Sequence, residues 1–169
     1  VITSGAVTIV PKESGQDAGT ITRRNVLDIR NGIHANSRTS PSFLYMGNLD
    51  IEPELESMVG QDNRPLYLPG NSMATEPHDR LRGRPIMFSP HAPALGDPGD
   101  LLAVDWAGYC HVINQNSREE FSIHVKFLED KGVYRLVMFH GGQPYWEEGV
   151  TEPNSTTVRS FASAIAQRA

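Results

Sequence analysis

The segment from Leu81 to Asp105 constrains the fold most, because two apolar runs flank a long connection rich in proline and glycine. Ile86-Met87-Phe88 follows a Gly-Arg-Pro turn, and Leu101-Leu102-Ala103-Val104 follows Gly96-Asp97-Pro98-Gly99-Asp100. Short apolar runs bounded by turn residues are typical of buried β-strands. The segment therefore predicts strand, loop and strand. Its aspartates are expected to serve the turn, since carboxylates there bond nearby backbone amides.

Apolar periodicity predicts further elements on both sides of this segment. Strands are expected at 6–10, 43–46, 109–113, 121–128 and 133–139, with a turn at 129–132 that joins the last two in a hairpin. A helix is expected after Thr20 or Thr22, a second from Asp50 to Gly60, and a third in the tail, where Val158, Phe161 and Ile165 have helical spacing. A polar turn is expected at 36–41. Two strand–helix pairs followed by a run of strands indicate an α+β fold.

Composition limits the classes of function. A chain of 169 residues suits one domain of ordinary size, and 12 prolines with 15 glycines imply many loops. The 15 basic and 20 acidic residues give a net charge of −5 without long blocks of either sign. Nucleic-acid binders normally show a basic stripe, and none is visible along the sequence. No apolar run approaches the roughly 18 residues that a bilayer span requires.

The cysteine count and the first residues also carry information. Cys110 is the single cysteine, so the chain has no internal disulfide, which fits a reducing compartment. The start, Val1-Ile2-Thr3-Ser4, has neither an initiator methionine nor the basic-then-apolar layout of a secretory signal. We therefore expect the chain to be a piece of a longer protein.

The six histidines do not form a metal-binding motif. None stands in the H-x-H or H-E-x-x-H spacing that clusters ligands along a sequence, so ordinary structural or surface roles are expected for them. No metal and no cofactor is predicted.

Ser72 is the one residue that suggests an enzyme. Gly70-Asn71-Ser72-Met73 and Gly99-Asp100 resemble motifs of the signal-peptidase and LexA-like serine proteases. That chemistry requires a desolvated lysine to take the serine proton, and the resemblance would place it between Tyr109 and Asn114. The only lysines are Lys12, Lys126 and Lys131, so a Ser-Lys protease remains an alternative without a base at the expected place.

A series of short features in a fixed order resembles the C-terminal part of the tailed-bacteriophage major capsid proteins of the Hong Kong 97 type. The features lie between residues 18 and 146: Ala18-Gly19-Thr20-Ile21, Asn36-Ser37-Arg38, Phe43-Leu44-Tyr45-Met46-Gly47-Asn48, Leu66-Tyr67-Leu68-Pro69, Gly83-Arg84-Pro85-Ile86, Leu95-Gly96-Asp97-Pro98-Gly99-Asp100, Phe127-Leu128-Glu129-Asp130 and Gly142-Gln143-Pro144-Tyr145-Trp146. In that family an N-terminal arm, a long spine helix and an extended loop precede this region.

The resemblance implies a fold and a division into domains. Residues 1–120 would form an α+β axial domain, a central mixed sheet flanked by helices. Residues 121–169 would supply strands of the peripheral domain. Residues 61–82 would form a loop near a fivefold or sixfold axis. Exposed tyrosine and arginine often anchor such contacts, so Arg64, Tyr67, Arg80 and Arg82 are predicted at the subunit interface.

The same resemblance implies a structural and non-enzymatic role. Its partners would be copies of itself in pentamers and hexamers, together with scaffolding, decoration or portal proteins. Packaged DNA would be only a non-specific content, and no membrane partner is expected. The protein would be made in a bacterial host cytoplasm and would reside in the virion. A cargo-enclosing shell protein of the encapsulin type is a second alternative.

Overall fold

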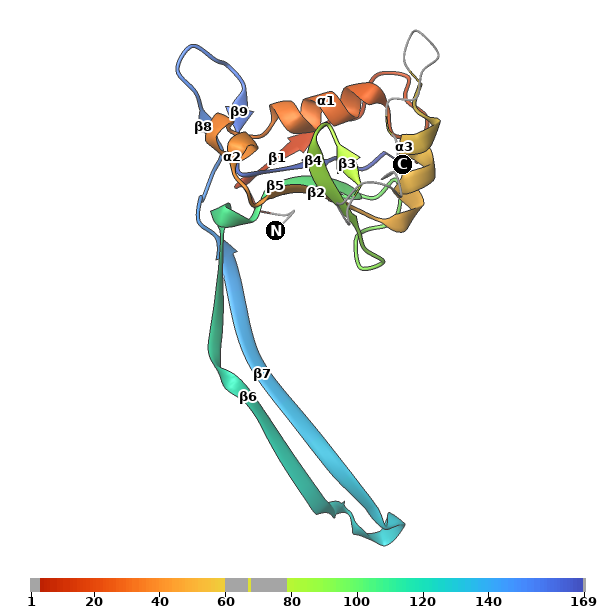
Figure 1. The fold of residues 1–169 in the computed structure, drawn as a ribbon, viewed down its shortest axis with the longest axis vertical. Helices are drawn as coiled ribbons and strands as arrows, with labels where there is room; N and C mark the ends of the chain where they lie inside the picture. The colour runs from red at the N-terminus through yellow and green to blue at the C-terminus, as the bar shows by residue number, and fades with distance from the viewer. Residues whose placement is uncertain (1–3, 60–66, 68–78, 169) are drawn as a thin grey trace. The chain divides into compact units, whose positions relative to one another are not determined.

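The computed structural model describes residues 4–59, 67 and 79–168. The chain divides into two compact units. The first unit comprises Val1–Gly108 and Pro144–Ala169 and contains a sheet with helices, whereas the second, Tyr109–Gln143, is a long β-hairpin (Figure 1). Each unit is described separately below.

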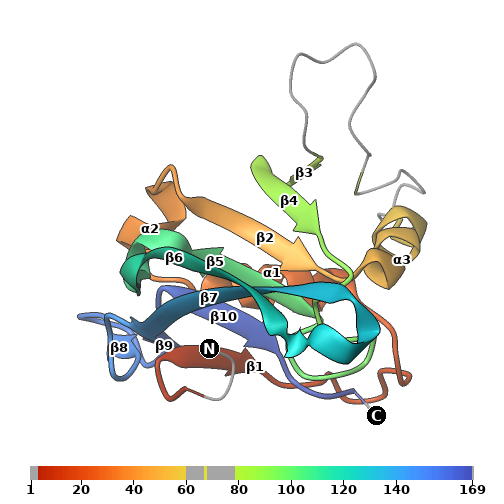
Figure 2. The ribbon, with the colours of Figure 1, turned by 90° about the horizontal axis from the view of Figure 1, so that it is seen from below.

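A mixed six-stranded sheet organises the first unit, with the strand order β1-β10-β5-β2-β4-β3 (Figure 2). Pairs β1–β10 and β2–β4 are parallel, and the other three pairs are antiparallel. The strands are β1 Val7–Val10, β2 Phe43–Gly47, β3 Arg80–Leu81, β4 Arg84–Phe88, β5 Leu101–Asp105 and β10 Ala162–Ile165. The sheet and its helices confirm the α+β class, and β4 and β5 confirm the strands predicted in the Leu81–Asp105 segment.

The described helices of the first unit are short. They are α1 Arg23–Asn31, α2 Ala35–Thr39, α3 Glu52–Ser57 and the 3-10 turns η1 Leu49–Ile51 and η2 Trp106–Gly108. The second unit adds the 3-10 turn η3 Phe127–Glu129. Helix α2 replaces the turn predicted at 36–41, because the His34 side chain accepts a hydrogen bond from the Asn36 N–H and so caps a helical turn.

Helix α1 begins where the sequence predicted. The Thr22 hydroxyl accepts a hydrogen bond from the Asn25 N–H (3.3 Å), and the Asn25 side chain accepts one from the Thr22 N–H (3.0 Å). These reciprocal bonds satisfy two donors that a helix start leaves without partners. Val26 and Ile29 are buried in the core, which also holds Phe43 and Tyr45 of β2.

The predicted Asp-Pro-Gly-Asp turn is closed by a buried ion pair. The Asp100 carboxylate accepts hydrogen bonds from the N–H groups of Gly96 (2.9 Å) and Leu101 (2.8 Å), which confirms the turn role predicted for Asp100. It is also paired with the guanidinium of Arg168, and both side chains are fully buried. The Arg168 N–H donates to the Gly96 carbonyl (2.9 Å), so a residue far along the sequence holds the loop that contains Gly96 and Asp100 in place.

The tail forms a strand, and the helix predicted there is wrong. Strand β10 lies between β1 and β5, and all four of its residues are buried. A strand covered on both faces has no alternation of polar and apolar residues that would distinguish it from a helix. Before it, β8 Val150–Thr151 and β9 Val158–Arg159 form a small antiparallel ladder.

The second unit confirms the predicted hairpin. Strand β6, Tyr109–Lys126, pairs with β7, Lys131–Pro144, in a two-stranded sheet. The turn between them includes Asp130, whose φ of 52° is left-handed. Asp tolerates that conformation better than most residues, so Asp130 explains why the chain turns at this position.

Candidate assembly surfaces

The four residues predicted at the interface lie in different surroundings. Arg64 lies outside the described residues. Arg80 and Arg82 are exposed, and their part in an interface stays a prediction. Tyr67 is only 3% exposed and belongs to the hydrophobic core of its own chain, in contrast to the exposed anchor that was expected. Burial, followed by the negative charge of Asp79, raises the pKa of the Tyr67 hydroxyl.

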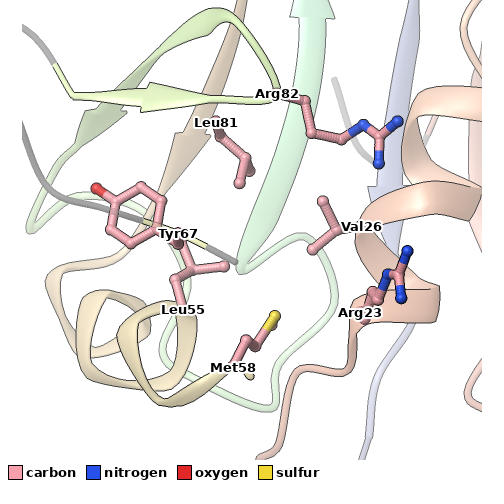
Figure 3. Close-up of a pocket in the computed structure, with 7 residues that line it drawn as sticks. All are labelled: Arg23, Val26, Leu55, Met58, Tyr67, Leu81 and Arg82. Atoms are coloured by element: carbon pink, nitrogen blue, oxygen red, sulfur yellow. The ribbon is translucent and has the colours of Figure 1, made fainter. Parts of the chain in front are cut away.

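Tyr67 lines a small pocket of about 110 Å³ in the first unit. Its other lining residues are Arg23, Val26, Leu55, Met58, Leu81 and Arg82. Figure 3 shows Arg23 and Arg82 on either side of Val26. Pockets for small molecules are typically several hundred Å³, so this one has room for about one side chain.

Four arginines gather over strands β2 and β4, and we call Arg30, Arg38, Arg82 and Arg84 the arginine patch. Arg30 donates to the Arg82 carbonyl (3.0 Å), and Arg84 donates to the Arg38 carbonyl (2.6 Å). Arg84 also lies over the Phe43 ring, 5.7 Å from its centroid, in a cation–π contact. These bonds hold the guanidinium groups of Arg30 and Arg84 against backbone carbonyls of Arg82 and Arg38.

The pKa values of two neighbouring groups reflect this concentration of positive charge. Burial, and then the charges of Arg159 and Arg30, lower the pKa of Arg38. Burial raises the pKa of Tyr45, which lies beneath the patch, and the nearby arginines oppose that shift. The sequence showed no basic stripe because the fold brings these arginines together from separate segments.

The hairpin of the second unit has one strongly apolar face. Phe121 and Tyr134 contact each other across the two strands, with ring centroids 4.7 Å apart. Because side chains alternate along a strand, their neighbours at every second position share this face. The apolar face comprises Phe121, Ile123, Val125, Tyr134, Leu136 and Met138, each more than half exposed. The alternation is visible in the sequence at 121–125, but it does not show that the face is left uncovered.

The opposite face of the hairpin is mixed. It carries the polar residues Ser122, His124 and Arg135, with Arg135 3.9 Å from Glu120, and also the exposed ring of Phe139. A two-stranded hairpin is at best marginally stable alone in water. An exposed apolar face of this kind marks a surface for interaction.

The described residues provide no support for enzymatic or metal chemistry. Ser72 lies outside them. Lys126 is exposed and pairs with Glu129 (3.3 Å), so it is not desolvated as a catalytic lysine must be. Within 4–59, 67 and 79–168, no three His, Cys, Asp or Glu side chains come together as a metal site would need.

The histidines that the structure describes have ordinary surroundings. His34 caps α2 and stacks edge-on with Trp146, with ring centroids 5.5 Å apart. His111 and His140 face each other across the hairpin at 5.8 Å. His78 lies outside the described residues. None of the helices in the described part of the chain combines the length and apolar character that crossing a membrane would take.

Comparison with known proteins identifies the family. The model of the phage capsid family matches residues 2–153. A search of curated proteins finds no match. The chain belongs to the phage capsid family, which makes it a structural protein of the major capsid type. No observation favours the protease alternative.

Solved structures show the same fold. The capsid of an empty GTA particle matches with a TM-score of 0.68 and 17% identity over 98% of this chain. The capsid of a native GTA particle matches with a TM-score of 0.68 and 16% identity, also over 98%. This chain spans 51% and 56% of the length of those two proteins, about half of each.

Proposed function

We propose that this chain is part of the major subunit of a phage-type icosahedral head, whose copies form pentamers and hexamers and enclose a genome. The observation that carries the proposal is the apolar face of the hairpin. Within the described residues nothing covers it, and a subunit of a shell would bury it against neighbouring parts of the particle. The family and the fold support the same role.

The two compact units support a revised domain assignment. The axial domain would comprise 1–108 and 144–169, and the peripheral part would be 109–143, in place of a single boundary at residue 120. Strand β10 supports this assignment, since it completes the sheet of the first unit between β1 and β5. Scaffolding, decoration and portal proteins would be further partners. Packaged DNA would be a non-specific content of a particle made in a bacterial cytoplasm.

A matched pair of substitutions in the full-length gene product tests this function. Ile123→Asp places a charge on the apolar face, and His124→Asp places one at the next position, on the opposite, mixed face. We expect Ile123→Asp to abolish rings and shells, because burying an unpaired carboxylate is costly, while His124→Asp assembles. Sedimentation and negative-stain microscopy measure the particles. A wild-type protein that stays monomeric at high concentration would overturn the proposal, as would normal shells from Ile123→Asp.

A further inference from the structure

The first unit carries two surfaces of opposite charge. One is the arginine patch. The other is the segment Leu49–Ser57, formed by η1 and α3, which we call the acidic segment. It holds four carboxylates and no basic residue: Asp50, Glu52, Glu54 and Glu56.

The arginine patch is not neutralised by its own chain. Its hydrogen bonds go to neutral carbonyl oxygens: Arg30 to the backbone of Arg82, Arg38 to the backbone of Ile33 and to both carbonyls of Asn31, and Arg84 to the backbone of Ser40 and Arg38. A carbonyl satisfies a donor but does not cancel a positive charge. Within the ranges that the structure describes, none of the four arginines forms an ion pair. The nearby carboxylate of Glu152 is already held by Arg159 (2.6 Å).

The acidic segment is equally without a cation. Among the described residues, none of its four carboxylates forms an ion pair. Asp50 and Glu56 are exposed, and Glu52 and Glu54 are partly exposed. The positive end of the short helix stabilises the carboxylates of the first turn only weakly, which leaves most of the negative field at the surface.

We propose that the arginine patch of one copy binds the acidic segment of the next copy in the ring. The inference rests on the proposed function, because it requires that copies assemble. Figures 1 and 2 both place α2, which carries Arg38, and α3 at opposite ends of the sheet. The Arg38 end of the patch therefore lies away from the acidic segment, whereas Arg82 lines the same pocket as Leu55 and Met58. A contact between two different faces of identical subunits is heterologous, and such contacts close into rings.

Charge complementarity is the reason for choosing a second copy as the partner. The chain itself presents the matching carboxylates, and its net charge is −5. Opposite charges steer association and fix its register, whereas like charges that face each other repel and oppose it. Nucleic acid is the other polyanion that an arginine patch could contact, and the experiment below separates the two.

The test exchanges the charges of the two surfaces in the full-length gene product. One variant carries Arg30→Glu with Arg82→Glu, a second carries Glu54→Lys with Glu56→Lys, and a third carries all four changes. A matched control, Lys12→Glu with Glu147→Lys, reverses exposed charges outside both surfaces. Mass photometry counts rings and shells at low and high salt, and thermal unfolding of the unassembled subunits checks that each variant folds.

Each double variant is expected to lower the yield of particles by about tenfold or more, since like charges then meet at every contact. The fourfold variant restores the yield, because its charges are again complementary, and the control assembles like wild type. If a double variant fails to fold, Arg30→Gln with Arg82→Gln and Glu54→Gln with Glu56→Gln replace it. The neutral variants should assemble more slowly and lose most of the salt dependence of the rate.

Three results would contradict the inference, and they differ from failure of the proposed function. Wild-type yields from either double variant, or no recovery in the fourfold variant, would remove the contact while leaving the shell protein intact. If the arginine variants alone form normal particles that retain less nucleic acid, the patch binds nucleic acid instead. A wild-type protein that forms no rings would overturn the proposed function and this contact together.

Discussion

Arg168 brings a positive charge into the core of the first unit, and its partner Asp100 lies 68 residues earlier in the sequence. Arg168→Met should lower the free energy of unfolding by about 3–5 kcal/mol, because it leaves the Asp100 carboxylate buried without its counter-charge. Urea unfolding followed by circular dichroism measures the change. The matched control is Arg135→Met on the exposed hairpin, which should cost less than about 1 kcal/mol. An equal, small effect of both substitutions would contradict the structural role of the pair.

Tyr45 and Tyr67 predict a stability limit at alkaline pH. Burial raises the pKa of both hydroxyls in the folded chain. The folded state therefore keeps protons that the unfolded state has released, and the free energy of unfolding should fall as the pH rises above about 10. Urea titrations between pH 8 and 11 measure the slope. Tyr45→Phe with Tyr67→Phe should flatten it, and an unchanged slope in that double variant would assign the alkaline loss to other groups.

At the scale of elements, the sequence predicted correctly those features that neighbouring residues determine. Thr22 begins α1 because its hydroxyl meets an adjacent amide, and the turn before Lys131 closes the hairpin through residues that are contiguous in sequence. Strand β10 was missed because its neighbours, β1 and β5, come from distant segments. The predicted interface loop lies mostly outside the described residues, so Arg64 stays a prediction.

The apolar face of the hairpin predicts a change in amide protection on assembly. In the unassembled subunit, amides at 121–138 should exchange quickly, because two strands alone are marginally stable. The amides of β5 and β10 should exchange slowly, since these strands lie inside the sheet. Hydrogen exchange read by mass spectrometry should show the hairpin becoming protected in rings and shells. Equal protection of the hairpin before and after assembly would contradict its role as a contact surface.

At the scale of the whole molecule, the hairpin is an insertion between two positions that already meet. The Tyr145 N–H donates to the Gly108 carbonyl at 2.8 Å, within the first unit. Replacing residues 109–143 by a short Gly/Ser linker should therefore leave the first unit folded and abolish assembly. Tryptophan fluorescence of Trp106 and Trp146 monitors the fold, and sedimentation monitors the particles. An unfolded product would show that the first unit depends on the hairpin.

The candidate surfaces also show what a sequence can reveal at this scale. The glutamates at 52, 54 and 56 were visible in the sequence, within the helix that was predicted from Asp50 to Gly60. The arginine patch was not visible, because Arg38 and Arg84 are 46 positions apart and come together only in the folded chain. A charged surface built from distant segments requires the fold before it can be found.

The parallel pairing of β1 with β10 has a consequence for the timing of synthesis. Val7 pairs with Ala162, so the sheet of the first unit cannot close until the ribosome has released nearly the last described residues. Such long-range pairing slows folding, because a long loop must be ordered before its contacts form. A growing chain on the ribosome therefore lacks the finished sheet, and polysomes that translate the same message should not join their unfinished products into premature shells.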